Sequence, residues 1–488
     1  MTMNDGATTA YDVVRYPNWP NARTNPATLG ALVQLLGRPA TRADKCRVLE
    51  IACNEGTNIA SMAVAAPGSE FVGIDLAASA IARGRKTIAL AGLTNVSLQC
   101  RNIADPAAVE GEFDYIIAHG IFAWTPESVR NAILRVFGRN LSPRGVAFLS
   151  YNVFPGCRLR QTLRDYLTRM VDSVDDPGER MEKARWALEY QIDGWSEDIP
   201  FQKALIETAR SALERPSQVL FHDEMGMIWE PQFLDAVVAA GRRQGLAYLA
   251  DALPSSVQDC LFESARFEAA RRLTGGDWAR YEQLLDFTDM RAFRWSLFVR
   301  DGVPIDRLAT PDRVRGLWAS AALTRVEPRP GQRAHVFRAP NEVEYETDDS
   351  GLADLLDALS STAATPLDAI ADRADLVEAA LRLYVNGVVT LSNAPPAYCL
   401  TPGDKPLASP LSRAQAAQGE QVLAALHHKP VRMDDPFWYR FLQEIDGAKD
   451  RADLARFVSA QTGKGEDEAR ILAPRALEAF ARLRLLMA

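Results

Sequence analysis

The amino-acid sequence predicts an α/β protein in which a doubly wound, mostly parallel sheet is followed by a helix-rich C-terminal part. Three observations predict this class. Residues 47–151 alternate strand and helix patterns with short connections, their strand segments are almost continuously apolar, and residues 306–488 are mainly helical in pattern. Continuously apolar strands are typical of parallel sheets, because both faces of such sheets are buried. The length of 488 residues also predicts several domains rather than one.

Five strands are expected within the first 160 residues. Each is a short apolar segment followed by a turn or by a helix pattern. The predicted strands are residues 47–53, 70–74, 96–101, 113–118 and 145–151, and the predicted helices between them are residues 57–66, 77–91 and 128–139.

Two further strands are expected after a helical segment. The pattern is helical from Leu159 to about Leu220, and residues 231–245 predict an amphipathic helix that ends at a glycine. Residues 246–250 and 294–300 have strand patterns. We interpret them as the last two strands of the first sheet, which resumes after a helical insertion and then has seven strands. The alternative is a separate α+β domain.

The chain beyond residue 305 is expected to form two smaller domains. Residues 323–326 and 334–337 flank the turn EPRPGQR and predict a hairpin, and residues 352–392 show three helices followed by a strand, a winged-helix-like order. Residues 438–488 loosely repeat this order, and the Pro- and Gly-containing segment 395–408 is the best linker candidate. The predicted domains are residues 1–160, 161–230, 231–305, 306–395 and 396–488.

Composition excludes several classes of function. The chain has a net charge of −8 and no strongly basic region, so we expect no nucleic-acid partner. No segment approaches the roughly 18 consecutive apolar residues of a membrane span. The six cysteines are far apart and form no CxxC pair, so we expect no metal site and a reducing, cytoplasmic location.

The segment VLEIACNEGTN, residues 48–58, follows the template acidic-x-small-x-small-x-Gly. Its steps of two differ from the G-x-G-x-x-G of dinucleotide-binding loops. A loop of small residues before a helix N-terminus suits a nucleoside with an aminocarboxylate, as in S-adenosyl-L-methionine. We expect Glu50 to lie near the cofactor ammonium, or else to cap a helix or pair with Arg47. Asn54 can adopt a left-handed backbone, whereas Ala52 is expected not to.

Two more strand ends carry polar residues that suit an adenosine. Asp75 ends the second strand and can accept hydrogen bonds from both ribose hydroxyls, although an aspartate there is equally a helix N-cap. Asn102 follows the third strand and can contact the adenine edge while Ile103 packs on the ring, although an asparagine there is commonly a turn residue. The order of the three sites along the chain matches one bound nucleoside.

The chain resembles bacterial class I methyltransferases with an appended regulatory domain, a group that includes rickettsial protein lysine methyltransferases of outer-membrane proteins. The usual Gly-Cys-Gly of that group stands here as Ala52-Cys53-Asn54, and its adenine-side aspartate as Asn102. The segments that carry the resemblance span nearly the whole chain and are Glu50–Asn58, Asp75, Asn102, AHGIFAW (118–124), YDVVRYPNWPNARTNP (11–26), SYNVFPG (150–156), LFHDEM (220–225), EPQF (230–233), FRWSLFVR (293–300), HHKPVRMDD (427–435) and IDGAKDRADL (445–454).

The resemblance implies a class I methyltransferase Rossmann-like sheet, S-adenosyl-L-methionine as cofactor, an N-terminal segment that caps this cofactor, and a homodimer. With these implications, the candidate cofactor site comprises Tyr16, Glu50, Ala52, Cys53, Asn54, Gly56, Asn58, Asp75, Leu76, Asn102, Ile103 and His119.

Candidates for the methyl-transfer site follow the fourth and fifth strands. His119 could act as a base or orient the substrate, and Tyr151 and Asn152 offer a hydroxyl and an amide carbonyl to a target amine. Phe122 and Trp124 could form the wall of the substrate pocket and face a cation. The alternatives are a hydrogen-bonded loop histidine and aromatic core residues.

The favoured function is therefore an S-adenosylmethionine-dependent methyltransferase that acts on a lysine amine of a protein or peptide. The same core serves small-molecule N- or O-methyltransferases, which is the first alternative. The second alternative is a non-catalytic regulator with a degenerate cofactor site, because two of the three expected glycines are missing.

Overall fold

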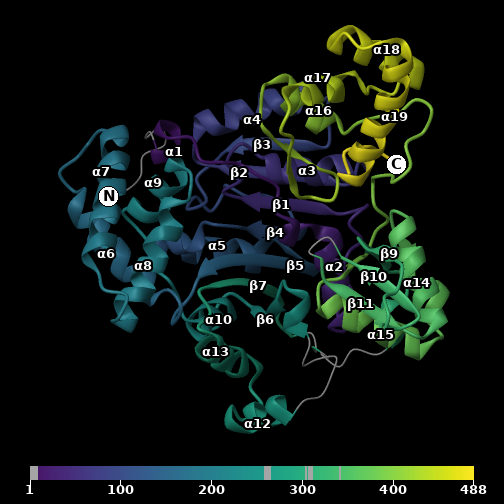
Figure 1. Cartoon of the computed structure of the whole chain (residues 1–488). Coiled ribbons are helices and arrows are strands. Elements are labelled where there is room, and N and C mark those ends of the chain that lie inside the picture. Colours follow the sequence, from purple (N-terminus) through teal and green to yellow (C-terminus); the bar gives the residue numbers. More distant parts are fainter. Residues whose placement is uncertain (1–8, 258–264, 303–304, 306–310, 340–341) are drawn as a thin grey trace.

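The computed structural model of the chain describes residues 9–257, 265–302, 305, 311–339 and 342–488. A seven-stranded sheet in the order β3-β2-β1-β4-β5-β7-β6 forms its centre (Figure 1). Strands β1 to β5 are parallel, and β7 is antiparallel to both of its neighbours, β5 and β6. The strands are β1 (Arg47–Ile51), β2 (Glu70–Asp75), β3 (Val96–Cys100), β4 (Phe113–Ala118), β5 (Leu141–Asn152), β6 (Leu246–Asp251) and β7 (Phe293–Arg300).

The last two strands confirm that the sheet resumes after the insertion, and the alternative of a separate α+β domain is wrong. Strand β7 pairs along β5 from Ala147 opposite Phe298 to Asn152 opposite Phe293. The helix before β6 ends at Arg242, three residues before Gly245, and the turn that follows it contains this glycine with a positive φ of 73°. Helix α10 (Leu234–Arg242) packs on β6 and on α13 (Trp278–Asp289), and α12 (Ala265–Leu273) contacts α13 and projects away from the sheet (Figure 1).

Helices cover both faces of the sheet, and the strand residues alternate between the two sides. Val48 and Ile117 pack in the hydrophobic cluster of α2 (Pro26–Leu35), α3 (Thr57–Ala65) and α4 (Ala78–Leu90). Leu49 and Ile116 pack on the opposite face with α5 (Glu127–Asn140) and α10. This alternation follows from the two-residue period of a strand.

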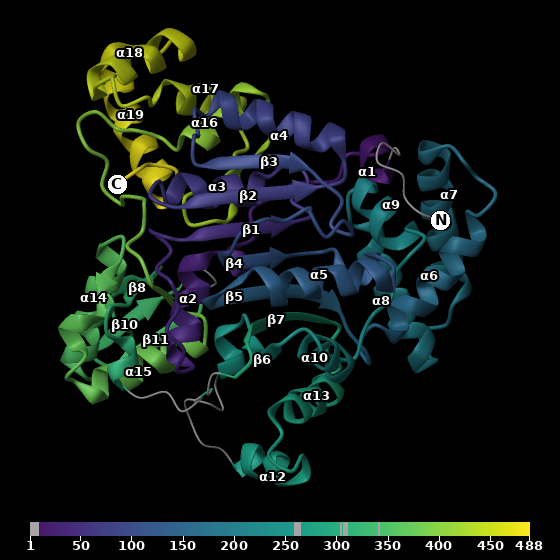
Figure 2. The same cartoon turned by 180° about the vertical axis from the view of Figure 1, so that it is seen from behind.

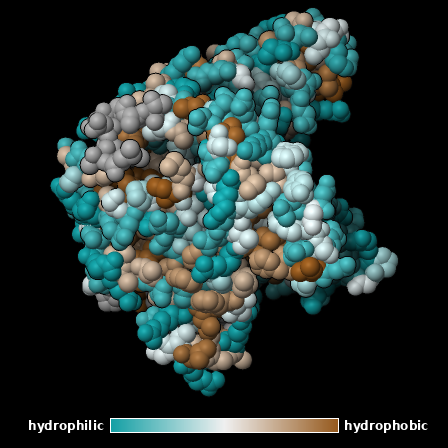
Figure 3. All heavy atoms as spheres, turned by 90° about the vertical axis from the view of Figure 1, so that its left-hand side faces the viewer, coloured by the Kyte–Doolittle hydropathy of each residue, from teal (hydrophilic) through white to brown (hydrophobic). Residues whose placement is uncertain are grey.

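The helical insertion between β5 and α10 lies at one end of the sheet, on the left in Figure 1. Its helices pack around their own apolar cluster, which includes Leu163, Leu188 and Leu220. On the face that Figure 3 shows, apolar residues are interspersed with hydrophilic ones. Within the described ranges no helix has the length and hydropathy needed to cross a membrane. The insertion helices are α6 (Arg158–Met170), α7 (Pro177–Gly194), α8 (Pro200–Leu213) and α9 (Ser217–Met225).

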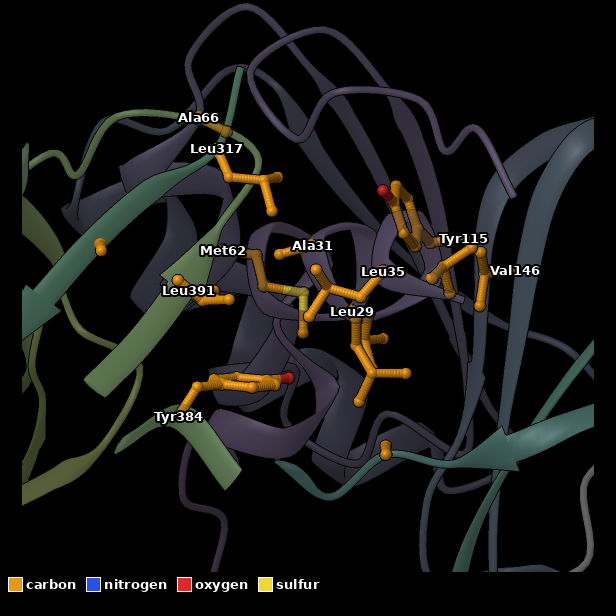
Figure 4. Packing of buried hydrophobic residues seen from close by; sticks show 14 of the residues in the cluster. Leu29, Ala31, Leu35, Met62, Ala66, Tyr115, Val146, Leu317, Tyr384 and Leu391 are labelled. Atoms are coloured by element: carbon orange, nitrogen blue, oxygen red, sulfur yellow. The ribbon is translucent and has the colours of Figure 1, made fainter. Parts of the chain in front are cut away.

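Residues 311–392 form a compact unit that shares the core of the sheet domain. Figure 4 shows Leu29 and Leu35 of α2 between Tyr115 and Val146 of the central sheet and Leu317, Tyr384 and Leu391 of this unit, and all belong to one buried cluster. The predicted hairpin is present, and the second of the three predicted helices is a single 3-10 turn. The elements are η4 (Pro311–Val314), β8 (Trp318–Ala321), β9 (Thr324–Val326), β10 (His335–Arg338), β11 (Glu344–Thr347), α14 (Ser350–Ser361), β12 (Thr365–Pro366), η5 (Leu367–Ile370), α15 (Ala374–Val385) and β13 (Val389–Ser392).

The C-terminal residues pack against α3 and α4 of the first domain, as Figure 2 shows from behind. The predicted linker has little regular structure, but backbone pairing joins Tyr398 to Met487 and Ala408 to Leu486. The two ends of this domain are therefore held together. The elements are α16 (Pro410–Ala417), β14 (Val422–Ala424), β15 (Pro430–Arg432), α17 (Pro436–Glu444), α18 (Arg451–Thr462) and α19 (Glu466–Arg482).

Candidate active site

A cavity of about 1740 Å³ lies at the carboxyl ends of the parallel strands and extends to the C-terminal part of the chain. Open α/β sheets bind their ligands at this edge. Most of the predicted site residues line the cavity, whereas Gly56, Phe122 and Tyr151 do not. The lining residues among the predicted ones are Tyr16, Glu50, Ala52, Cys53, Asn54, Asn58, Asp75, Leu76, Asn102, Ile103, His119, Trp124 and Asn152.

The loop after β1 has three residues in the left-handed backbone region, at Ala52 (φ 59°), Asn54 (φ 51°) and Gly56 (φ 72°). The expectation that Ala52 avoids this region is wrong. Long-range hydrogen bonds hold the loop, because the Asn54 N–H donates to Asp75 Oδ2 at 2.8 Å and the Cys53 N–H donates to the Ile74 carbonyl at 3.1 Å. The close approach at Gly56 excludes a side chain, since a Cβ there would lie 2.6 Å from Leu98.

Glu50 is the buried acidic residue at the base of the cavity and is 4% exposed. Its Oε1 accepts a hydrogen bond of 2.6 Å from Asn58 Nδ2. Among the described residues, no donor reaches Oε2. Burial raises the pKa of Glu50 to about 8. The alternative ion pair with Arg47 is absent, because Arg47 pairs with Glu70 at 3.0 Å.

The unpartnered Oε2 shows that this carboxylate suits a cationic or hydrogen-bond-donating group of a ligand, because a buried polar atom normally has a partner. An ammonium on an aminocarboxylate provides such a group. The free carboxylate acceptor at the end of β1 therefore fits the ammonium of the cofactor that the loop motif predicts.

Asn102 has the turn role named as an alternative, whereas the N-cap of α4 is Ala77 and not Asp75. Both Asp75 and Asn102 also face the cavity. Asp75 Oδ1 accepts from the Ala77 N–H at 2.8 Å at the start of α4, and Asn102 Oδ1 accepts from the Ala104 N–H at 3.0 Å. Burial raises the pKa of Asp75. These bonds hold both side chains at neighbouring strand ends, where the second lone pairs of the Asp75 oxygens and the amide nitrogen of Asn102 can meet one nucleoside.

The N-terminal segment closes the cavity over the loop after β1. The Asn18 amide oxygen faces the N–H groups of Glu55, Gly56 and Thr57 at 3.1–3.3 Å and thereby caps α3. The Asn21 N–H donates to Asn58 Oδ1 at 2.8 Å. Tyr16 of this segment was named as a candidate from the sequence but its asparagines were missed, although short polar side chains before a helix are a capping signal.

His119 is held by two hydrogen bonds at the end of β4. Its Nε2 accepts from the Asn21 amide at 2.9 Å, and its Nδ1 lies 2.6 Å from Ser150 Oγ. Burial, together with the charge of Arg23, lowers the pKa of His119 to about 4. The imidazole is therefore neutral at pH 7, and both of its nitrogens are engaged. This arrangement suits an orienting role better than proton transfer.

Tyr151 and Phe122 lie in the core and not on the cavity wall, contrary to expectation. The Tyr151 hydroxyl is 3.1 Å from Ser296 Oγ, and the Phe122 ring packs 5.7 Å from the Tyr151 ring. Successive side chains of a strand face opposite sides of the sheet. Tyr151 and Asn152, which are adjacent on β5, therefore point in different directions.

Asn152 and Trp124 do line the cavity. Asn152 Oδ1 accepts from Trp229 Nε1 at 3.1 Å, and the Arg164 guanidinium lies 5.2 Å from the Trp124 ring centre. The second tryptophan, Trp229, was not predicted. It follows the helical insertion by a few residues, so this side of the site depends on the resumed part of the fold.

Three family models match successive parts of the chain. Residues 48–145 match a methyltransferase domain, residues 216–300 a predicted methyltransferase regulatory domain, and residues 404–472 a PKMT C-terminal winged helix domain. The uncharacterized protein RP028 of Rickettsia prowazekii is 30% identical over 220 residues, which are 45% of this chain and 88% of RP028. The chain belongs to the class I S-adenosylmethionine-dependent methyltransferases with a regulatory domain and a winged helix domain.

Two other similarities concern a longer relative and the fold. The uncharacterized protein RP789 of Rickettsia prowazekii is 31% identical over 306 residues, which are 62% of this chain and only 55% of RP789. The structure of PKMT2 from Rickettsia typhi in complex with AdoHcy superposes with a TM-score of 0.83 at 22% identity and covers 97% of this chain and 100% of that chain. The fold thus extends over nearly the whole methyltransferase. The winged helix match lies in the segment expected as a helical C-terminal domain.

Sequence reasoning missed two residues that reach the site from distant parts of the methyltransferase. Asp223 of α9 lines the cavity and accepts a hydrogen bond of 3.3 Å from the Tyr16 hydroxyl, and burial raises its pKa. His428 of the C-terminal domain contacts Asn58 and Ser61. Both occur in segments that carry the family resemblance, but nothing in their local sequence indicates that Asp223 lines the cavity or that His428 contacts Asn58.

Proposed function

We propose that this methyltransferase transfers a methyl group from S-adenosyl-L-methionine to a lysine amine of a protein or peptide. The observation that carries the proposal is the size and extent of the cavity. Its volume is about 1740 Å³ and its wall runs from Glu50 to Tyr384 and Lys429. Small-molecule sites have volumes of about 300–1000 Å³, so this cavity offers room for a polypeptide segment beside the cofactor. The name of the similar PKMT2 structure supports the same substrate class.

The proposed cofactor contacts follow the strand ends. Glu50 receives the ammonium, Asp75 the ribose, and Asn102 with Ile103 the adenine. S-adenosyl-L-methionine supplies an electrophilic methyl group on a sulfonium. The protein then has to position the acceptor in line with this group and exclude water.

The acceptor side is proposed to comprise the cavity-lining residues around the ends of β4 and β5. Trp124 provides an aromatic face and Asn152 provides an amide. Asp223, which accepts from Tyr16 and also pairs with Arg160 and Arg215 at 3.7–3.8 Å, provides a carboxylate. An aromatic face and a carboxylate both attract an ammonium. A carboxylate with a raised pKa can also accept the proton that the lysine loses before transfer. His119 orients the N-terminal segment through Asn21.

The test uses methyl-labelled S-adenosyl-L-methionine with purified basic proteins and, in parallel, a panel of small amines and alcohols. We expect label in protein and, by peptide mass spectrometry, methyl increments on lysine. An acceptor protein whose lysines are reductively methylated beforehand is the control. Label confined to small molecules would indicate the first alternative, and no turnover together with no heat on titration with S-adenosylhomocysteine would indicate the non-catalytic regulator.

We also propose a homodimer that forms through the helical insertion. Trp186 and Tyr190 of α7 are each 65% exposed, and their rings lie 6.0 Å apart. Exposed aromatic pairs of this kind are enriched in protein interfaces. Light scattering is expected to give twice the chain mass of 53.7 kDa, and Trp186→Glu is expected to halve it. A wild-type mass of one chain would exclude the dimer.

A cytoplasmic location is proposed from the cysteines. Within the described part of the chain, Cys46, Cys53, Cys100, Cys157 and Cys399 are all free thiols. Free thiols persist in reducing compartments. Fractionation of the native host cells, with an antibody against this chain, is expected to find it with cytoplasmic markers, and recovery in an oxidising compartment would contradict this.

A further inference from the structure

The C-terminal domain places one histidine directly against the cofactor-binding helix. His428 is 2% exposed and lies in the turn between β14 and β15. Its Nδ1 is 2.9 Å from Ser61 Oγ, and its Nε2 is 2.9 Å from Asn58 Oδ1. Asn58 and Ser61 are one helical turn apart on α3. A residue of the last domain therefore contacts the helix that follows the loop after β1.

The partners determine which nitrogen of His428 bears the proton. Asn58 Oδ1 is only an acceptor, so Nε2–H donates to it, and Nδ1 accepts from the Ser61 hydroxyl. Two further contacts support this assignment of the Asn58 amide and hold it together with His428: Oδ1 also accepts from the Asn21 N–H at 2.8 Å, and Nδ2 donates to Thr24 Oγ1 at 3.1 Å. Burial and the adjacent His427 lower the pKa of His428 to about 3, so the ring is neutral at ordinary pH.

The nitrogen of the Asn58 amide contacts Glu50. With Oδ1 held by His428 and the N-terminal segment, Nδ2 points at Glu50 Oε1 at 2.6 Å. A rotated amide would present its oxygen to the carboxylate. The path from the C-terminal domain to Glu50 thus consists of two hydrogen bonds, both between buried side chains.

We propose that His428 is a positioning residue for the cofactor site: by holding the Asn58 amide, it keeps Glu50 oriented for the cofactor ammonium, so that the His428–Asn58 contact, and not domain docking in general, raises cofactor affinity. The proposal for His428 rests on the proposed function in one respect, which is that Glu50 binds the cofactor. It makes the winged helix region part of the binding site rather than a separate appendage.

The interface offers a matched control. Gln418 of the same domain accepts a hydrogen bond of 2.9 Å from Thr87 of α4. This contact joins the same two domains, but it ends on the surface of α4 and no hydrogen bond continues from Thr87 to Glu50 among the described contacts. Its loss weakens docking without disturbing the Asn58 amide.

The experiment is calorimetric titration of the full-length chain with S-adenosylhomocysteine. His428→Asn keeps a polar group at the position of Nδ1 but does not reach Asn58, whereas His428→Gln places an amide N–H near the position of Nε2. We expect at least tenfold weaker binding for His428→Asn, substantial recovery for His428→Gln, and a change within twofold for Gln418→Ala. Where transfer can be measured, KM for S-adenosyl-L-methionine is expected to rise far more than kcat falls.

Thermal unfolding of each variant without ligand identifies variants that fail to fold. Ser61→Ala then provides a second test, because Ser61 contacts the other ring nitrogen of His428, Nδ1. We expect a several-fold loss of affinity for Ser61→Ala, because the ring is then free to turn. Wild-type affinity in His428→Asn, or an equal loss in Gln418→Ala, would overturn the proposal. A wild-type chain that binds S-adenosylhomocysteine but methylates no protein would refute the proposed acceptor and leave this inference intact.

Discussion

The amide of Asn58 donates a hydrogen bond of 2.6 Å to Oε1 of Glu50, while Oε2 of the same buried carboxylate has no donor among the described residues. One oxygen is thus held by the protein and the other is left for a ligand. Glu50 in β1 and Asn58 in α3 both belong to the segment of residues 48–58. This motif therefore orients its own acidic residue.

The raised pKa of Glu50 predicts pH-dependent cofactor binding. With a pKa of about 8, the unliganded carboxyl is mostly protonated at pH 7, whereas an ammonium is best bound by the ionised form. Binding at pH 7 should therefore release a proton, and affinity for S-adenosylhomocysteine should rise from pH 6 to pH 8. Titration in buffers of different ionisation enthalpy measures the proton directly.

Glu50→Gln is the control for this behaviour. It keeps the shape and the bond from Asn58 but removes the charge, so affinity should fall by about 1.5–3 kcal/mol and the proton release should vanish. Proton release that persists in Glu50→Gln would assign it to another group.

The left-handed backbone at Ala52 predicts a stabilising substitution. Glycine tolerates a φ of 59° without the Cβ clash, so Ala52→Gly should raise the free energy of unfolding by about 1 kcal/mol. Ala82→Gly is the matched control, because Ala82 is an exposed residue inside α4 and there the same change should destabilise by about 1 kcal/mol. Urea unfolding measures both, and equal signs would contradict the assignment of strain to Ala52.

The separation of Tyr151 from the cavity predicts that its hydroxyl is dispensable for turnover. Tyr151→Phe removes the hydrogen bond to Ser296 and should cost about 0.5–1.5 kcal/mol of stability while kcat/KM stays within about twofold. Asn152→Ala, one residue further along β5, should lower kcat/KM at least tenfold, because Asn152 lines the cavity. A larger kinetic loss for Tyr151→Phe than for Asn152→Ala would reverse this assignment.

Burial of His428 predicts a loss of stability in acid. Its pKa is about 3 in the folded chain against about 6.5 when unfolded, so the unfolded state binds more protons and stability falls as the pH drops below 6.5. The contribution of this one residue between pH 7 and pH 5 is about 2 kcal/mol. His428→Gln should therefore show a shallower decline in urea unfolding, and an unchanged decline would show that the folded residue titrates normally.

Local sequence was sufficient to predict that three polar residues line one cavity. Glu50 and Asp75 lie at the ends of apolar strands and Asn102 follows one, and the carboxyl ends of parallel strands meet at one edge of a sheet. Spacing along the chain therefore predicts their proximity in space. The same reasoning failed at Tyr151, because the two-residue period places it on the core side of β5 and the end of that strand could not be located to one residue.

The sequence by itself determined the sheet, its resumption at β6 and β7, and the acidic, small and polar residues at the strand ends. These depend on periodicity and on interactions between neighbouring residues. Only the tertiary structure decided which groups complete the site. Asn21 engages His119, and His428 reaches Asn58 across 370 positions of the chain. Such contacts depend on how whole domains pack, and no local pattern of residues encodes them.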